Sequence, residues 1–182
     1  MHVTTVVYRD DAELVAVCDI KKDIADKSAK KFGTKAYYDY ERMIEEVKPD
    51  IVHVCLPHYL HPVASRFAIE HGVNVLCEKP IAIDYKSGEE NVALAEQKCV
   101  NYGVIFQCRY NDASQLVKKT LLSGELGKII SARSTLTWYR PDSYYKNSDW
   151  KGTWKYEGGG VIINQAIHSM DLVNWFIGSD PI

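Results

Sequence analysis

Four short runs of mostly apolar residues constrain the fold of this chain more than any other feature of its sequence. They span residues 14–18, 51–56, 73–77 and 104–107. Apolar runs of this length are typical of strands that are buried on both faces of a parallel sheet. Between them lie segments with helical spacing of apolar residues, at 23–32, 40–47, 62–70 and 87–100. The alternation predicts an α/β fold with a doubly wound parallel sheet.

Beyond the fourth run the pattern changes. A helix is predicted over 113–122. Apolar and polar residues then alternate over 130–138, which is typical of a half-buried strand in an antiparallel sheet. A loop rich in aromatic residues follows, and then a helix over 161–177. We therefore expect two domains, one over residues 1–108 and one over residues 109–182.

Composition excludes several classes of partner. The chain has 182 residues, 46% of them hydrophobic and 25% charged, which is ordinary for a soluble globular protein. Its net charge of −2 does not indicate a nucleic acid partner. There is no apolar run of membrane-spanning length and no signal peptide, so we predict a cytoplasmic protein without a membrane partner. The five cysteines form no C-x-x-C pair. We interpret them as small buried hydrophobes and predict no metal, although a cluster at the strand ends stays open.

Two short motifs carry residues suited to alcohol–ketone chemistry. Glu78-Lys79-Pro80 follows the third apolar run, so Lys79 is either held rigidly at the end of a buried strand or solvated before a turn. Gly158–Gly160 opens a second segment, in which Asn164 and His168 lie four residues apart and share a helix face. A lysine and a histidine that converge on one oxygen can stabilise that oxygen and move its proton.

Polar residues also follow the first two apolar runs. Asp19 ends the first apolar run. In dinucleotide-binding folds an acidic residue at this place accepts hydrogen bonds from the ribose hydroxyls and disfavours a 2′-phosphate. An aspartate here can equally cap the next helix. Lys21 and Lys22 follow closely, so NADP stays open beside NAD. Leu56-Pro57-His58 and His61 lie where the second run ends, which is the ligand crevice of open α/β sheets or simply a turn before a helix.

Aromatic and basic residues are concentrated in residues 138–156. Such surfaces stack on sugar rings, but they are also common in cores and at subunit interfaces. The set consists of Trp138, Tyr139, Tyr144, Tyr145, Trp150, Trp154 and Tyr156, with Arg140, Lys146 and Lys151 among them.

Nearly the whole chain resembles the Gfo/Idh/MocA family, which includes glucose–fructose oxidoreductase and inositol dehydrogenase. Glu78-Lys79-Pro80 matches the family motif without change, and the segment from Gly158 through Asn164, His168 and Asp171 resembles its glycine-rich stretch. The resemblance implies a Rossmann-like domain followed by part of a domain that binds substrate and forms homo-oligomers. It also implies NAD(P)-dependent oxidation or reduction of a sugar, polyol or cyclitol.

The resemblance further implies roles for individual residues. Lys79 would orient the substrate oxygen, and His168 would be the general acid and base. The contacts to the cofactor would come from the ends of the predicted strands, namely Asp19, Leu56, Pro57, His58, His61, Glu78 and Lys79. The contacts to the substrate would come from Arg109, Tyr110, Asn164 and His168.

The sequence departs from the family pattern at two places. Asn164 stands where family members carry aspartate, and an amide can orient an imidazole but cannot stabilise an imidazolium by charge. No G-x-G-x-x-G occurs in the chain. We expect the strand before that loop to be missing from the centre of the sheet, and we interpret the chain as a fragment of a longer parent, with Met1 internal. An NAD-dependent glycosidase and a non-catalytic binding subunit stay open as alternatives.

Overall fold

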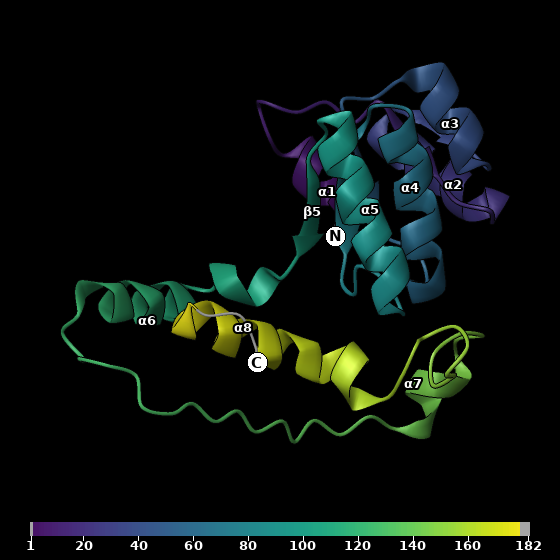
Figure 1. The fold of residues 1–182 in the computed structure, drawn as a ribbon. Coiled ribbons are helices and arrows are strands. Elements are labelled where there is room, and N and C mark those ends of the chain that lie inside the picture. The colour runs from purple at the N-terminus through teal and green to yellow at the C-terminus, as the bar shows by residue number, and fades with distance from the viewer. Residues whose placement is uncertain (1, 179–182) are drawn as a thin grey trace.

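The structure, a computed structural model, describes residues 2–178, so Met1 lies outside the described residues (Figure 1). Its strands are all parallel and form two sheets. One sheet pairs β1 (Ala16–Cys18) with β2 (Lys35–Tyr37). The other has the order β3 (Ile51–Val54), β4 (Asn74–Glu78), β5 (Tyr102–Ile105). The predicted α/β class with parallel strands is confirmed.

The two sheets are separated where the missing strand was expected. Among the described residues β1 pairs only with β2, and β3 pairs only with β4. A doubly wound sheet of the order 3-2-1-4-5-6 places its first strand between these two edges. The backbone groups on the open sides of β1 and β3 therefore have no strand partner within residues 2–178.

Among the described residues five α-helices belong to this half, and some of their ends carry caps that the sequence supplies. The helices are α1 (His2–Val7), α2 (Lys22–Phe32), α3 (Tyr40–Val47), α4 (His61–Glu70) and α5 (Tyr85–Lys98). The Asp39 side chain accepts hydrogen bonds from the backbone of Glu41 and Arg42 at the start of α3. Gly33 ends α2 in the left-handed conformation that glycine adopts without strain.

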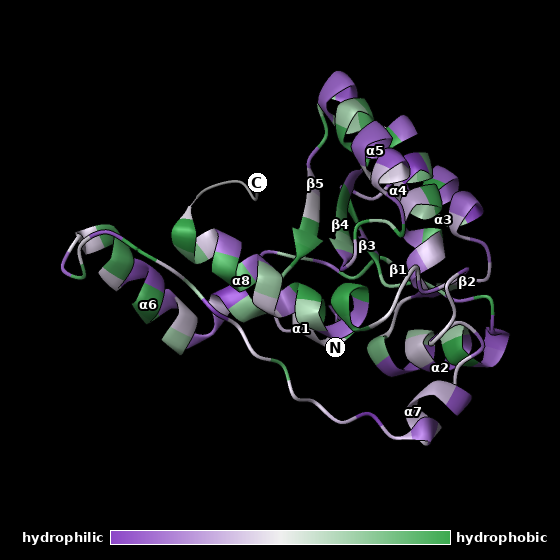
Figure 2. Cartoon of the chain, turned by 60° about the horizontal axis from the view of Figure 1, so that its bottom comes forward, coloured by the Kyte–Doolittle hydropathy of each residue, from purple (hydrophilic) through white to green (hydrophobic). Residues whose placement is uncertain are grey.

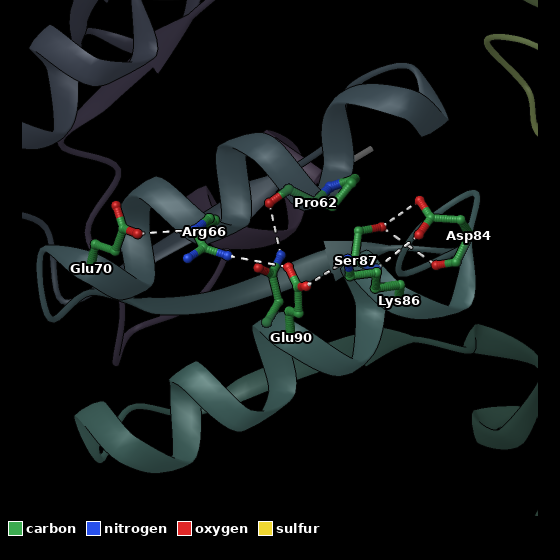
Figure 3. Close-up of polar contacts among 8 residues, drawn as sticks. Pro62, Arg66, Glu70, Asp84, Lys86, Ser87 and Glu90 are labelled. Atoms are coloured by element: carbon green, nitrogen blue, oxygen red, sulfur yellow. Dashed lines mark hydrogen bonds and ion pairs between the residues drawn. The ribbon is translucent and has the colours of Figure 1, made fainter.

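Polar contacts between α4 and α5 fix the start of α4 (Figure 3). The buried Asn91 amide donates to the carbonyl oxygen of Pro62 at 2.7 Å. Arg66 reaches Glu70 at 3.0 Å on its own helix and Glu90 at 3.7 Å on α5. The turn that leads into α4, the short helix η1 (His58–Leu60), is thereby held at the carboxyl end of β3.

The hydrophobic core lies between the three-stranded sheet and helices α3 to α5. In Figure 2 hydrophobic residues concentrate along β4 and β5, whereas hydrophilic residues appear along the covering helices. The core consists of Met43, Ile44, Val54, Ala64, Ala68, Ile69, Val73, Val75, Cys77 and Ala95. Cys77 packs as a small hydrophobe, as predicted, whereas Cys55 and Cys99 are exposed.

The second half is built from helices. It contains η2 (Gln107–Tyr110), α6 (Asp112–Ser123), α7 (Asp142–Lys146), the π-helix η3 (Ile162–Ala166) and α8 (Ile167–Ile177). Helices α6 and α8 lie side by side, and the Lys118 ammonium donates to the carbonyl oxygen of Trp175 at 2.5 Å (Figure 1). The helix predicted over 161–177 is confirmed in place, but its first turns are of the wider π type.

The antiparallel strand predicted over 130–138 is wrong. Residues 129–141 have no regular secondary structure, and Figure 1 shows them as a long extended segment that connects α6 with α7. Ile130 is 97% exposed and Trp138 is 59% exposed. An alternating pattern makes a strand only where a neighbouring strand accepts and donates its backbone hydrogen bonds, and the described residues offer none here.

Candidate active site

A cavity of about 340 Å³ lies at the carboxyl ends of β3 and β4. Both halves of the chain line it. The first half contributes Cys55, Leu56, His58, His61, Glu78 and Lys79, and the second contributes Tyr144, Trp150, Asn164, Gln165 and His168. The structure therefore brings together the lysine and the histidine that the sequence singled out. Asp19, Pro57, Arg109 and Tyr110, also predicted to contact ligands, do not line this cavity.

Lys79 follows β4 and crosses to the second half. Its ammonium donates to the carbonyl oxygen of Asn164 at 2.5 Å. Burial lowers the pKa of Lys79, and the nearby charge of Lys151 lowers it further, whereas Glu78 and Glu157 act in the opposite direction. The lysine is thus held at the strand end, and its contact to a backbone carbonyl can be exchanged for a ligand oxygen.

Glu78 is held by the first helix. One carboxylate oxygen lies 2.9 Å from Nε2 of His2 in α1, and the other accepts a hydrogen bond from the Lys79 backbone at 3.2 Å. This carboxylate therefore links α1 to the end of β4, next to the lysine.

His168 lies one residue into α8 and faces the cavity. Its Nδ1 atom is buried and has no hydrogen-bond partner among the described residues. Burial lowers the pKa of His168, and the charge of Lys79 lowers it further. A neutral imidazole with an uncommitted nitrogen is suited to exchanging a proton with a bound ligand.

Asn164 does not orient His168, although the sequence suggested that it could. Its amide nitrogen donates to a carboxylate oxygen of Glu157 and lies 3.4 Å from the Tyr144 hydroxyl, and its oxygen accepts from Gln165 at 3.0 Å. The reason is local, because a π-helix changes the angular spacing of residues four apart. Asn164 still lines the cavity, but its amide is committed to other partners.

Glu157 is a site residue that sequence reasoning missed. It is only 2% exposed, and its carboxylate accepts from the backbone of Gly152 at 2.6 Å as well as from Asn164. The next residue, Gly158, has φ +90°, and a Cβ there would lie 2.6 Å from Cβ of Ile83. Gly158 thus lets the backbone beside Glu157 approach Ile83 of the first half closely, as the three consecutive glycines suggested.

His58 joins the first half to the aromatic loop, by which we mean residues 139–156. Its Nδ1 lies 3.0 Å from the carbonyl oxygen of Glu157, and its ring centroid is 4.6 Å from that of Trp150. The adjacent Tyr59 backbone donates to Tyr156 at 3.2 Å. Burial lowers the pKa of His58 to about 4, so the ring is neutral near pH 7. The wall of the cavity formed by Trp150 is therefore anchored on η1.

His61 fastens the ends of two strands. It is 1% exposed, with Nδ1 at 2.7 Å from the carbonyl oxygen of Pro80 and Nε2 at 2.6 Å from that of Leu56. Both ring nitrogens thus face backbone carbonyls, and the ring holds the turn after β4 against the turn after β3.

Arg109 forms an ion pair with Asp171. The guanidinium donates through Nε at 2.8 Å and through Nη2 to the two oxygens of a carboxylate that is 8% exposed. The Arg109 guanidinium also lies 5.7 Å from the ring of Phe106 and 5.9 Å from that of Trp175. It therefore attaches α8, and with it His168, to the segment that joins the two halves. Tyr110 is 79% exposed.

The chain matches two family models. Residues 1–106 match the GFO_IDH_MocA model, an oxidoreductase family with an NAD-binding Rossmann fold. The chain belongs to this family. Residues 114–182 match the GFO/IDH/MocA C-terminal domain. The recognition made from the Glu78-Lys79-Pro80 motif and the glycine-rich stretch is confirmed.

Individual relatives are about twice as long as this chain. D-glucoside 3-dehydrogenase of Escherichia coli K12 is 30% identical over 98% of this chain and 50% of its own length. The crystal structure of the WlbA dehydrogenase from Bordetella pertussis, in complex with NADH and UDP-GlcNAcA, has a TM-score of 0.91 and 30% identity over 97% of this chain and 51% of its own. Glycosyl hydrolase family 109 protein 1 of Akkermansia muciniphila is 33% identical over 75% of this chain and 32% of its own length.

The described residues fit part of a dinucleotide. Asp19 lies just after β1, where a ribose-binding acid belongs. One of its oxygens accepts from the backbone of Lys21, the residue before α2, at 2.8 Å, and its side chain does not cap that helix. Leu56, His58 and Lys79 line the crevice beyond β3 and β4. The glycine loop that normally holds the pyrophosphate does not occur in the sequence. Within residues 2–178 no group of three metal-ligating side chains comes together, and no helix has the length and apolar character to cross a membrane.

Proposed function

We propose that this chain is part of an NAD(P)-dependent oxidoreductase that acts on a hydroxyl or carbonyl group of a sugar, polyol or cyclitol. The observation that carries the proposal is the meeting of Lys79 and His168, from different halves of the chain, in one cavity at the strand ends. The relatives support it, since D-glucoside 3-dehydrogenase is named for sugar oxidation and WlbA was solved with NADH and a nucleotide sugar.

The two residues divide the work at the reacting oxygen. The Lys79 ammonium, which donates to the Asn164 carbonyl in this structure, donates to the substrate oxygen and stabilises the negative charge that develops there. The His168 imidazole, which lines the cavity, accepts the hydroxyl proton during oxidation and returns it during reduction. Nicotinamide supplies the hydride chemistry when it is bound. Asn164 and Glu157 act indirectly, by fixing the backbone that Lys79 contacts.

NAD is the proposed cofactor, with its ribose at Asp19 and its nicotinamide end near Pro57, His58 and Glu78. The negative charge of Asp19 disfavours the 2′-phosphate of NADP. Lys21 and Lys22, which follow Asp19, are the cations that would reverse that preference. Equal kcat/KM with NADP would count against this assignment.

The proposal also covers the domain boundary, the oligomeric state and the location of the protein. We place the domain boundary between residues 108 and 109, and we assign homo-oligomer formation to the second domain. Exposed apolar side chains such as Leu122 and Ile162, at 75% and 64%, support an interface there. A cytoplasmic protein without nucleic acid or membrane partners agrees with the net charge of −2.

Steady-state kinetics test the reaction. NADH formation is measured with a panel of sugars and cyclitols for the wild type, Lys79→Ala and His168→Ala. We expect both variants to lose about 10²–10⁴-fold in turnover because each removes a group at the reacting oxygen. His71→Ala and Lys98→Ala are matched controls outside the cavity and should retain turnover. Near-normal rates for His168→Ala at saturating substrate would refute its role.

A second function is favoured by one relative, the glycosyl hydrolase family 109 protein. An NAD-dependent glycosidase would use the same two residues but would return the hydride within each cycle. Release of a reducing sugar from an aryl glycoside without accumulation of NADH would favour it. A binding subunit without catalysis would instead bind sugar and show neither product.

A further inference from the structure

Two positive charges lie against one aromatic ring that lines the cavity. The Lys151 ammonium is 4.3 Å from the centroid of the Tyr144 ring, and the Arg140 guanidinium is 5.2 Å from it. Tyr144 itself lines the cavity. A ligand that brings an anion to this ring is attracted by both charges.

The carboxylate nearest this ring among the contacts described above, Glu157, is bound by the backbone of Gly152 and by Asn164 and forms no ion pair with either cation. Neither Arg140 nor Lys151 forms an ion pair within residues 2–178, whereas Lys146 in the same loop pairs with Asp142 at 3.7 Å. The Nε atom of Arg140 is buried and has no hydrogen-bond partner there. A buried donor without an acceptor is costly, so this nitrogen is suited to a ligand that brings an acceptor.

Aromatic rings fix both cations beside the cavity. Arg140 also lies 5.4 Å from the ring of Trp138, and Lys151 lies 5.8 Å from the ring of Trp150, which lines the cavity. Both cations are half-buried. The charge of Lys151 reaches into the cavity, since it lowers the pKa of both His58 and Lys79.

We propose that Arg140 and Lys151 form an anion subsite for a carboxylate or phosphate carried by the sugar substrate. This proposal rests on the proposed function and narrows its substrate class to acidic sugars, such as hexuronates, sugar phosphates or nucleotide sugars. A guanidinium donates two parallel hydrogen bonds to a carboxylate or phosphate, and the ammonium adds a point charge. The sugar ring would pack against Tyr144 and Trp150, with its reacting carbon at Lys79 and His168.

Three probes that differ only at carbon 6 test the subsite: D-glucose, D-glucuronate and D-glucose 6-phosphate. Titration calorimetry gives the affinity of each, and NADH formation gives KM. We expect at least one acidic probe to bind about tenfold or more tightly than glucose, as one charge-assisted hydrogen bond allows. In Arg140→Gln and in Lys151→Gln the ratio of affinities should fall towards one. The preferred probe identifies a carboxylate or a phosphate as the anion.

Lys155→Gln is the matched control, because Lys155 lies in the same loop but against Tyr156, at 5.0 Å, rather than against Tyr144. It should leave the ratio unchanged. Equal binding of glucose and both acidic probes, no binding of either acidic probe, or a preference that survives both glutamine variants would overturn the subsite. If acidic sugars bind more tightly in a way that depends on Arg140 but no sugar gives NADH, the anion subsite is supported and the dehydrogenase function is refuted. If sugars are oxidised but acidic sugars bind no more tightly than glucose, the dehydrogenase function is supported and the anion subsite is refuted.

Discussion

Residues 2–105 and residues 107–178 bury different kinds of side chain. In the first region Ile44, Ile69 and Val75 are each no more than 2% exposed and belong to a continuous hydrophobic core. In the described part of the second region the buried side chains are all polar, namely Ser114, Glu157 and Asn164. Several of its large apolar residues face outwards, with Leu122 at 75% and Ile130 at 97% exposure, and others such as Val173 are half-buried.

This difference suggests that the first region determines the stability of the fold and the second determines the geometry of the site. Hydrophobic burial is non-directional and proportional to area, so it stabilises the first region without specifying a particular contact. The second region contacts the first through directional hydrogen bonds instead, from Lys79 to Asn164 and between His58 and Glu157, and the pair of Arg109 with Asp171 holds α8 within it. Substitutions in the first region should therefore change the free energy of unfolding, whereas those in the second should change the alignment of the cavity.

Truncating one apolar residue in each region tests this difference between the regions most directly. Ile69→Ala, at a position with no exposure, should lower the free energy of unfolding by about 2–5 kcal/mol. Leu122→Ala should change it by less than about 0.5 kcal/mol, because that side chain is already exposed. Urea denaturation followed by far-UV circular dichroism measures both. Similar losses would mean that the second region buries an apolar core of its own.

The contact between the regions at His58 should make stability depend on pH. Its pKa is about 4 in the folded protein and about 6.5 in an unfolded chain. Between these values the unfolded state binds a proton that the folded state does not, so the free energy of unfolding falls as pH falls from about 6.5 to about 4. Linkage limits the fall from this one group to about 3 kcal/mol.

His58→Asn should reduce that pH dependence, and denaturant titrations at several pH values measure it. His71→Asn is the control, since the ring of His71 is 38% exposed and lies at the end of α4. The same slope in the wild type and in His58→Asn would mean that His58 is not buried as the structure shows.

The smallest expected effect concerns the ion pair within the second region. Asp171→Asn leaves Arg109 without its carboxylate and should cost about 1–2 kcal/mol, a value reduced because the Arg109 side chain is 38% exposed. Hydrogen exchange should quicken in α8, and kcat should fall because His168 lies on that helix. Asp142→Asn, in an exposed pair with Lys146, should leave both unchanged. Unaltered exchange in Asp171→Asn would show that α6 alone holds α8.

Local patterns in the sequence were enough to predict most of the first region, although α1 was missed. The bounds of α3 agree because Asp39 caps it and Pro49 follows it, and the apolar runs became β1, β3, β4 and β5. The parallel arrangement followed from those runs being unbroken. Lys79 and His168 were also found from sequence, because each lies in a short motif with a distinct composition.

What the sequence did not predict depends on partners distant along the chain. Alternation over 130–138 says nothing about whether a neighbouring strand exists. The π-helix that turns Asn164 towards Glu157 has no local signal, and neither does the burial of a glutamate that precedes three glycines. Arg109 and Asp171 are 62 residues apart, so only the fold shows that they are paired.

The separation of the two sheets has a consequence for the motions of the first region. β4 pairs on both sides, so its amide hydrogens are protected by neighbours in either direction. β1 and β3 pair on one side only within the described residues, and every second amide on their open sides faces no acceptor strand. The β1–β2 unit is then joined to the rest through α3, which packs against α4, rather than through a shared ladder. Amide hydrogen exchange should therefore be faster in the β1–β2 unit than in β4 for the residues described here.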